Sequence, residues 1–456
     1  MIADKFRNAL DQTPDKLFIV SSSGKWTYAD FFNYTSRMAT VLEGFAPGRI
    51  ACHLPDSPQL IALMFGAGMC GRSLVLFNHD YSRQQIQPLL EQADVKTLIT
   101  GDKQISCAGC DIADPQVLPA ADDRRVAAFS GQPASDGELL ILTSGTTGKA
   151  KCVRYSWSRL FAQVKESRAS PDERWLLAYR LNHFAGVQML VHVLSNKSTL
   201  VLPRSNQVSD AITAMHEYQV THVSSTPTFW RFALTLLQKN RKQLSLRHLT
   251  LGSEASSADL LEKLHALFPE ARIVQIYAST EAGSCVSVSD MKPGLPVSVL
   301  SRPADAAVQF RILDGELQIK STNGMSGYLG ADPDAKATEG QWRPSGDLVR
   351  IENGRIIFIG RKNETINVGG VKVHPLDVEN LISPLAGVKL VRVYGQANPI
   401  VGQIVALDVV CNEGSNPAEV EEDIRRACDV LPPAGRPRSI NFVDAILTNN
   451  FKLSRL

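Results

Sequence analysis

Short apolar runs alternate with longer segments of helical periodicity through the first three quarters of the chain, and this alternation restricts the fold more than any other feature. The runs at 49–55, 72–78 and 95–101 predict strands, and the segments at 57–69 and 82–92 predict the helices between them. Further strands are predicted at 198–204, 220–227 and 271–279. Because parallel strands need a crossover, usually a helix, the pattern predicts an α/β fold of mostly parallel sheets flanked by helices. Function is expected in the loops at the carboxyl ends of these strands.

The sequence changes to turn-rich β segments after Asp314. Strands are predicted at 315–321, 346–354 and 354–361, and Asn353-Gly354 is a hairpin signal. The C-terminal part predicts strands at 388–394, 404–410 and 439–443 and a helix at 417–428. We therefore expect a large N-terminal domain at 1–359 with a β-rich segment at its end, a hinge at 360–363, and a small mobile C-terminal α+β domain at 364–456.

Charge and hydropathy exclude several classes of protein. The 456 residues carry 48 Lys and Arg against 46 Asp and Glu, without a block of like charges, so nucleic acid is not an expected partner. The N-terminus lacks the apolar stretch of a secretory signal, and the most apolar segment, 60–70, is too short to cross a bilayer. We expect a cytoplasmic protein without a membrane span.

The clearest local motif is the segment 142–151, LTSGTTGKAK, which follows the apolar run 138–142. Glycines allow backbone amides to point inward, hydroxyls add donors and lysines add positive charge, so this segment suits phosphate. A Ser/Thr/Gly surface loop is the alternative. The P-loop NTPase pattern does not fit, because Ala150 follows Gly148-Lys149 where that pattern needs Ser or Thr.

This motif resembles the signature of the adenylate-forming superfamily, which contains acyl-CoA synthetases, adenylation domains of peptide synthetases and luciferases. The resemblance extends along the whole chain. Further matches, in the family's order, are Trp26-Thr27-Tyr28, His53-Leu54-Pro55-Asp56-Ser57, Tyr277-Ala278-Ser279-Thr280-Glu281, Ser345-Gly346-Asp347, Gly360-Arg361 and Lys452. The resemblance implies an enzyme that uses ATP and Mg²⁺ to convert a carboxylate to an acyl-adenylate, and then passes the acyl group to a thiol. Such a site must neutralise the charge that develops on the α-phosphate.

The resemblance also assigns roles to individual residues. Catalytic roles fall to Lys452, to Thr280 at the α-phosphate and to Glu281 as the magnesium ligand. The residues implied in ATP binding are Thr143, Ser144, Gly145, Thr146, Thr147, Gly148, Lys149 and Lys151 at the phosphates, Ser253, Glu254, Ala255 and Tyr277 at adenine, and Asp347 and Arg361 at the ribose. Asn363 is implied as the hinge, and Gly369 and Gly370 as the border of a pantetheine tunnel.

Three positions depart from the family's pattern. Ala278 stands where the family usually has Gly, Phe451 replaces the Gly before the terminal lysine, and Asn363 replaces Asp or Lys at the hinge. A catalytically impaired ATP-binding homologue is therefore an open alternative.

The implied substrate pocket consists of His183, Phe184, Gly252, Ala278 and Ser279, although His183 and Phe184 also suit core packing. Amino-acid-activating relatives usually place an aspartate near this point to pair the ammonium group, whereas no Asp or Glu lies between Glu173 and Asp210. A buried ammonium without a partner is costly, so an uncharged aromatic or aliphatic acyl tail of short to medium length is favoured. A stand-alone amino-acid adenylation enzyme is the second alternative.

The thiol acceptor is expected to be CoA or an acyl carrier protein, and the sequence does not separate the two. An arginine-rich face of the small domain could attract either acidic partner. Its members are Arg425, Arg426, Arg436 and Arg438. The oligomeric state is left open.

Overall fold

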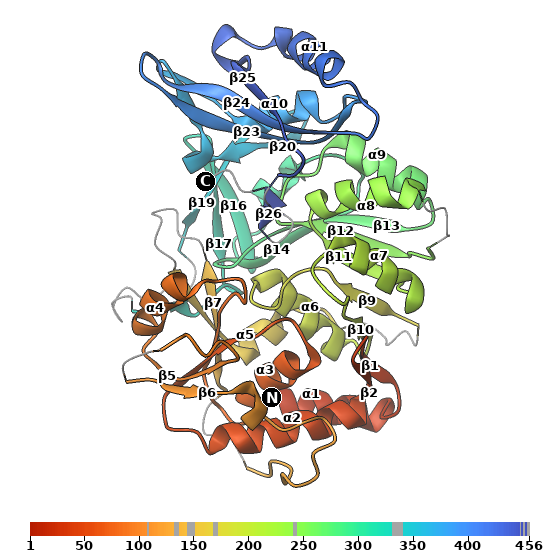
Figure 1. Ribbon diagram of the computed structural model, residues 1–456, viewed down its shortest axis with the longest axis vertical. Helices are drawn as coiled ribbons and strands as arrows, with labels where there is room; N and C mark the ends of the chain where they lie inside the picture. The colour runs from red at the N-terminus through yellow and green to blue at the C-terminus, as the bar shows by residue number, and fades with distance from the viewer. Residues whose placement is uncertain are drawn as a thin grey trace.

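The computed structural model describes residues 1–106, 109–131, 136–143, 151–166, 172–239, 244–330, 341–446, 448–449 and 452–453. The chain rises from the N-terminal helices at one end of the molecule to a separate C-terminal layer at the other (Figure 1). Two large sheets form the N-terminal part, a third β-rich sheet follows, and a fourth sheet belongs to the C-terminal part. The predicted α/β fold class is confirmed.

The first large sheet has eight strands in the order β14-β13-β12-β11-β9-β10-β1-β2, and only the two edge pairings are antiparallel. The strands are β1 (Leu17–Ser21), β2 (Gly24–Thr27), β9 (Arg174–Leu177), β10 (Thr199–Val201), β11 (His222–Ser225), β12 (His248–Gly252), β13 (Arg272–Ser279) and β14 (Gly283–Val288).

The second large sheet has seven strands in the order β18-β8-β7-β4-β3-β5-β6, with antiparallel pairing only at β7, β8 and β18. The strands are β3 (Arg49–His53), β4 (Leu74–Leu76), β5 (Val95–Thr100), β6 (Asp111–Ala113), β7 (Glu138–Thr143), β8 (Lys151–Ser156) and β18 (Gly327–Tyr328). The helices of the large domain are α1 (Ile2–Gln12), α2 (Tyr28–Glu43), α3 (Pro58–Met69), α4 (Arg83–Gln92), α5 (Trp157–Ala162), α6 (Phe184–Ser195), α7 (Val208–Glu217), α8 (Pro227–Lys239) and α9 (Ala258–Leu267).

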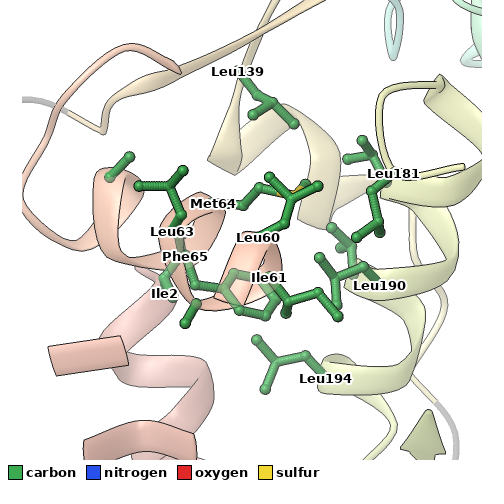
Figure 2. Close-up of a cluster of buried hydrophobic side chains, with 14 of the residues drawn as sticks. Ile2, Leu60, Ile61, Leu63, Met64, Phe65, Leu139, Leu181, Leu190 and Leu194 are labelled. Carbon is green, nitrogen blue, oxygen red and sulfur yellow. The ribbon is translucent and has the colours of Figure 1, made fainter. Parts of the chain in front are cut away.

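Helix α3 lies at the centre of the core that joins the two sheets. Ser57 caps its first turn by accepting from the Leu60 amide, and Pro58 follows at the first helical position. Figure 2 shows α3 side chains packed against Leu190 and Leu194 of α6. A Cβ on Gly68 would stand 2.3 Å from Ile2 Cδ1 and 2.4 Å from Trp157 Nε1, so only glycine permits this close approach of α1 and α5 to α3.

The β-rich segment forms a five-stranded sheet with its own core. Its strands are β15 (Leu295–Pro296), β16 (Val308–Leu313), β17 (Glu316–Ser321), β19 (Arg343–Glu352) and β20 (Arg355–Arg361). Asn353 and Gly354 both have positive φ, 49° and 72°, in the turn between β19 and β20, as the hairpin signal predicted.

The C-terminal part folds around a separate apolar cluster, which lies against the large domain at α8 and β20. It contains β21 (Ile366–Val368), β22 (Val371–Val373), β23 (Val388–Asn398), β24 (Gly402–Cys411), β25 (Ser439–Phe442), α10 (Pro375–Ile382) and α11 (Pro417–Ala427), and a short pair of strands, β26 (Thr448–Asn449) and β27 (Lys452–Leu453), follows. The predicted hinge, 360–363, covers the end of β20 and the start of a 3₁₀ turn at Lys362–Glu364. Within the described residues, no helix is both long and apolar enough for a membrane span.

Candidate active site

Tyr277, Asp347 and Arg361 form a hydrogen-bonded clamp, although they come from three strands, β13, β19 and β20. The Tyr277 hydroxyl donates to Asp347 Oδ2 at 2.6 Å, and Arg361 Nε lies 2.7 Å from Asp347 Oδ1. The Tyr277 ring also stacks on Phe358 at 5.1 Å between centroids. Burial holds the pKa of Tyr277 well above its usual value, and the Asp347 charge raises the pKa of Arg361, so both remain donors at neutral pH.

A second cluster surrounds Glu281 in the turn between β13 and β14. The Tyr328 hydroxyl donates to Glu281 Oε1 at 3.3 Å, and Lys151 Nζ lies 5.2 Å from the centre of the Tyr328 ring. The Tyr155 hydroxyl donates to the Thr280 carbonyl at 2.9 Å. Burial raises the pKa of Tyr328, with a further contribution from Glu281. The cluster therefore holds one carboxylate beside one lysine.

Hydrogen bonds to backbone groups fix the turn that contains Thr280 and Glu281. The Met325 amide donates to the Glu281 carbonyl at 3.0 Å, and Ser279 Oγ accepts from the Ala282 amide at 3.0 Å. A Cβ on Gly324 would stand 2.4 Å from the Glu281 carbonyl oxygen. A side chain at position 324 would therefore displace the turn.

The loop after β12 presents its backbone beside this site. Ser253 has φ 70°, a left-handed conformation that is uncommon for serine and is typical of functional loops. Glu254 Oε2 accepts from the Thr228 amide at 3.0 Å, in the first turn of α8. This carboxylate therefore stabilises the N-terminus of α8. The same hydrogen bond fixes the loop that follows β12 to a helix that precedes β12 in the chain.

A cavity of about 1270 Å³ begins at these residues and runs between α6 and one face of the eight-stranded sheet. It brings together twelve of the predicted site residues, from both ends of the sequence. They are Thr143, Lys151, His183, Phe184, Gly252, Ser253, Ala278, Ser279, Thr280, Glu281, Arg361 and Asn363. Phe184 stacks on Tyr155 at 5.2 Å, so it is also part of the core that supports the cavity wall.

A second cavity, of about 770 Å³, adjoins the first and lies between the large and small domains. Its walls include the clamp residues Tyr277, Asp347 and Arg361, and the loop residues Ser253, Glu254 and Ala255. The small domain contributes Leu376, Asn380 and Lys389 from its facing side. The predicted adenine and ribose residues thus share one cavity, next to the one that holds the predicted acyl residues.

Other predicted site residues are not brought to these cavities or cannot be placed in them. Ser144, Gly145, Thr146, Thr147, Gly148 and Lys149 lie outside the described residues. Gly369 and Gly370 form the exposed turn between β21 and β22, with φ 58° and 91°, and neither is among the residues found to line the two cavities. The backbone of Lys452 pairs with Asn449, and its strand β27 lies beside α8, the helix whose Arg231 and Leu234 line the second cavity.

Sequence reasoning missed Tyr328, which orients Glu281, and Phe358, which supports Tyr277. It also missed the polar side chains at the deep end of the first cavity. Among the described residues no group of three or more His, Cys, Asp or Glu could hold a metal ion. Glu281 nevertheless suits magnesium carried by a nucleotide, because such ions usually take one or two protein carboxylates together with phosphate oxygens and water.

Comparisons with known proteins agree with this geometry. The family model for the AMP-binding enzyme matches residues 6–329, and that for the AMP-binding enzyme C-terminal domain matches residues 377–452. A 2-succinylbenzoate–CoA ligase of Bacillus pumilus is 25% identical, over 96% of this chain and 93% of its own. Two solved structures share the fold. A benzoate CoA ligase from Burkholderia xenovorans has TM-score 0.83 at 20% identity, covering 99% of this chain and 98% of its own. The o-succinylbenzoate CoA synthetase of Bacillus subtilis has TM-score 0.75 at 22% identity, covering 98% and 96%.

Proposed function

The chain belongs to the AMP-binding enzyme family, and from this premise we propose that it is an AMP-forming acid–thiol ligase. It joins a carboxylic acid to ATP, releases pyrophosphate, and transfers the acyl group from the acyl-adenylate to a thiol. The observation that carries the proposal is the clamp of Tyr277, Asp347 and Arg361, which lines the second cavity and reaches the first through Arg361. The second cavity is proposed to hold the nucleoside and the first cavity the acid. The α-phosphate and the carboxylate would then meet beside the clamp.

Asp347 is the proposed ribose ligand. Each of its oxygens already accepts one hydrogen bond, from Tyr277 at 2.6 Å and from Arg361 at 2.7 Å. A carboxylate has about four acceptor positions, so each oxygen keeps one for a sugar hydroxyl. Tyr277 and Arg361 fix the orientation of the carboxylate, which a flexible aspartate alone would not hold.

Glu281 is the proposed magnesium ligand, since Tyr328 engages only one of its oxygens in the described structure. When bound, the ion supplies positive charge to the phosphate oxygens. The chain's own residues add donors at the same place: the Thr280 hydroxyl for the α-phosphate, and Lys151 for the outer phosphates together with the loop residues 144–150. Lys452 is proposed to approach the α-phosphate and the incoming carboxylate during adenylation, and Asn363 to act as the hinge that exchanges the two half-reactions.

CoA is the favoured acceptor, because the relatives reported above are named as CoA ligases. The carrier protein is less favoured, since the arginine-rich face is largely neutralised by its own neighbours. Arg425 pairs with Glu421, Arg426 with Asp423 at 3.1 Å, and Arg436 with Asp429 at 3.2 Å. Little uncompensated charge is left to attract an acidic protein. Gly369 and Gly370 are proposed to border the pantetheine arm after the small domain has rotated.

Pyrophosphate exchange into ATP tests the adenylation step. We expect exchange with an aryl or acyl acid and its loss in Glu281→Gln, whereas Glu270→Gln, a matched change at an exposed position after α9, keeps it. ATP binding measured by calorimetry is the second readout. Binding without exchange across benzoates, cinnamates, fatty acids and dicarboxylates would identify an impaired homologue, and exchange with amino acids alone would establish an amino-acid adenylation enzyme.

A further inference from the structure

The two faces of the eight-stranded sheet differ in polarity: one is apolar, and the other carries several polar side chains that a folded core does not need. One face carries Leu176, Val223, Leu249 and Ile273, which pack under α7, α8 and α9. The opposite face of the same strands carries the apolar Leu177, Val274 and Ile276 together with a row of Trp175, Ser224, His248, Thr250 and Arg272. Strands of a parallel sheet covered on both faces normally carry apolar residues on both. A polar row beneath a helix therefore points to a ligand.

Helix α6 covers this polar face and encloses the deep part of the first cavity. Phe184, Gln188 and His192 lie one helical turn apart and all line it. Across the cavity, Gly252, Thr250 and His248 descend along β12 at alternate positions. The helix rises about 12 Å over its eight residues, and the strand about 13 Å over its four. The cavity thus extends roughly 12 Å inward from the proposed reaction centre.

The deep end of the cavity concentrates hydrogen-bond donors that the protein does not use. Trp175 Nε1, Gln188 Nε2, His192 Nε2 and Thr250 Oγ1 are all buried without a partner among the described residues. A buried polar group without a partner costs stability, so four such groups on residues that line one cavity are best explained by a ligand that engages them. Arg272, an exposed residue at the first position of β13, adds a positive charge at the far end.

The histidines of this region are uncharged at neutral pH, and His192 is a donor. Burial lowers the pKa of His248 to about 4, with a further contribution from His222, and burial also lowers the pKa of His192 despite the opposing charge of Glu173. Asn196 Nδ2 lies 3.3 Å from His192 Nδ1 and also donates to the His192 carbonyl at 3.1 Å. An amide nitrogen only donates, so Nδ1 accepts and the hydrogen of His192 is on the unpartnered Nε2.

We propose that the acid this enzyme activates carries a second carboxylate, which binds at the deep end of the cavity among Thr250, Gln188, His192 and Arg272. This inference rests on the proposed function, and it changes the expectation of an uncharged acyl tail drawn from the absence of acidic residues. The same absence that disfavours an ammonium group favours an anion.

A carboxylate fits these donors better than other polar groups do. It only accepts hydrogen bonds, with about four positions, and the wall offers three nitrogen donors and one hydroxyl. A hydroxyl or an amide on the substrate would bring a donor of its own, which Thr250 and Gln188 can accept but Trp175 and Arg272 cannot. The depth of roughly 12 Å has to hold both carboxylates and the chain between them, which suits a medium-length diacid or a para-carboxylated aryl acid.

The test compares acids that differ only at the far end. Octanedioate is paired with octanoate, and para-carboxycinnamate with para-methylcinnamate, in pyrophosphate exchange and in calorimetric binding. A hydrogen bond to a charged group contributes roughly 10-fold to 100-fold, so we expect kcat/KM for the better diacid to exceed that of its partner by about 100-fold or more. Thr250→Val should lower the diacid value about 10-fold while the methyl-terminated acid keeps its own. Thr213→Val, a matched change on the exposed side of α7, should alter neither.

Each outcome decides between the two proposals. Exchange with the methyl-terminated acids at equal or higher efficiency, or a diacid preference that survives both Thr250→Val and Gln188→Leu, would overturn the second carboxylate and leave the ligase intact. Diacid-selective binding without exchange, lost in the same variants, would uphold the inference and refute the ligase. If neither exchange nor binding is observed with any acid, both proposals fail.

Discussion

Asp56 offers a prediction whose size follows directly from the structure. It lies in the segment His53-Leu54-Pro55-Asp56-Ser57, and its Oδ1 accepts from the Leu181 amide at 3.0 Å, just before α6 begins. Burial raises the pKa of Asp56 to about 6 from 3.8, although this hydrogen bond and Arg180 both oppose the shift. The buried environment of Asp56 therefore disfavours the ionised form of its carboxyl group.

The raised pKa makes stability depend on pH with a definite sign. Between pH 3.8 and about 6 the folded chain holds a proton that the unfolded chain has released, so this group's contribution falls as pH rises through that window. The difference between a pKa of about 6 in the folded chain and 3.8 in the unfolded chain corresponds to about 3 kcal/mol of lost stability above pH 7. Asparagine keeps an acceptor for the Leu181 amide but carries no charge. Asp56→Asn should thus be more stable than the parent by about 2 to 3 kcal/mol at pH 8, and nearly equal to it at pH 4.

Urea unfolding followed by tryptophan fluorescence at intervals from pH 4 to pH 8 measures this difference. Asp305→Asn, at an exposed loop position, is the matched control and should stay within about 0.5 kcal/mol of the parent throughout. A difference between Asp56→Asn and the parent that does not vary with pH, or a variant less stable at pH 8, would refute burial as the dominant influence on this carboxyl group.

Three further predictions concern the proposed site. Tyr277→Phe removes a charge-assisted hydrogen bond, so KM for ATP should rise roughly 10-fold or more while KM for the acid changes little in steady-state assays. Gly324→Ala should lower kcat at least about 10-fold by displacing the Glu281 turn, whereas Gly101→Ala, whose Cβ would meet only an ordinary 3.9 Å contact, should not. Lys452→Ala should abolish pyrophosphate exchange yet still transfer an acyl group from supplied acyl-adenylate to CoA, and equal loss of both steps would argue against a role confined to adenylation.

Local signals predicted most elements of the fold, because each depends on neighbours in the sequence. The helix at 57–69 has its cap, its Pro and its apolar residues in one segment, and Asn353-Gly354 supplies the two positive φ angles that its turn requires. The site residues were proposed differently, from the resemblance of whole motifs to those of a family. Their roles, the domain limits and the cytoplasmic location stay predictions.

Contacts between distant segments could not be predicted from the sequence. Tyr328 meets Glu281 only because β18 pairs with β8 at the edge of the second sheet, and no spacing in the sequence records this. His248, Thr250 and Gly252 occupy alternate positions of β12, but whether that face meets solvent, core or cavity depends on which side α6 crosses the sheet. The predicted phosphate loop at 144–150 and the Lys452 side chain lie outside what the structure describes.

The arrangement of α6 along the first cavity also bears on how acid length is selected. Phe184, Gln188 and His192 line the cavity at intervals of about 6 Å along its depth, because each is four residues further along α6. A bulky side chain at one of these three positions blocks the part of the cavity that lies deeper, and it leaves the strands, the clamp and the Glu281 turn unchanged. In the proposed acid site, length selectivity can therefore change in discrete steps through single substitutions on one helix, while the proposed nucleotide chemistry at the mouth of the cavity stays the same.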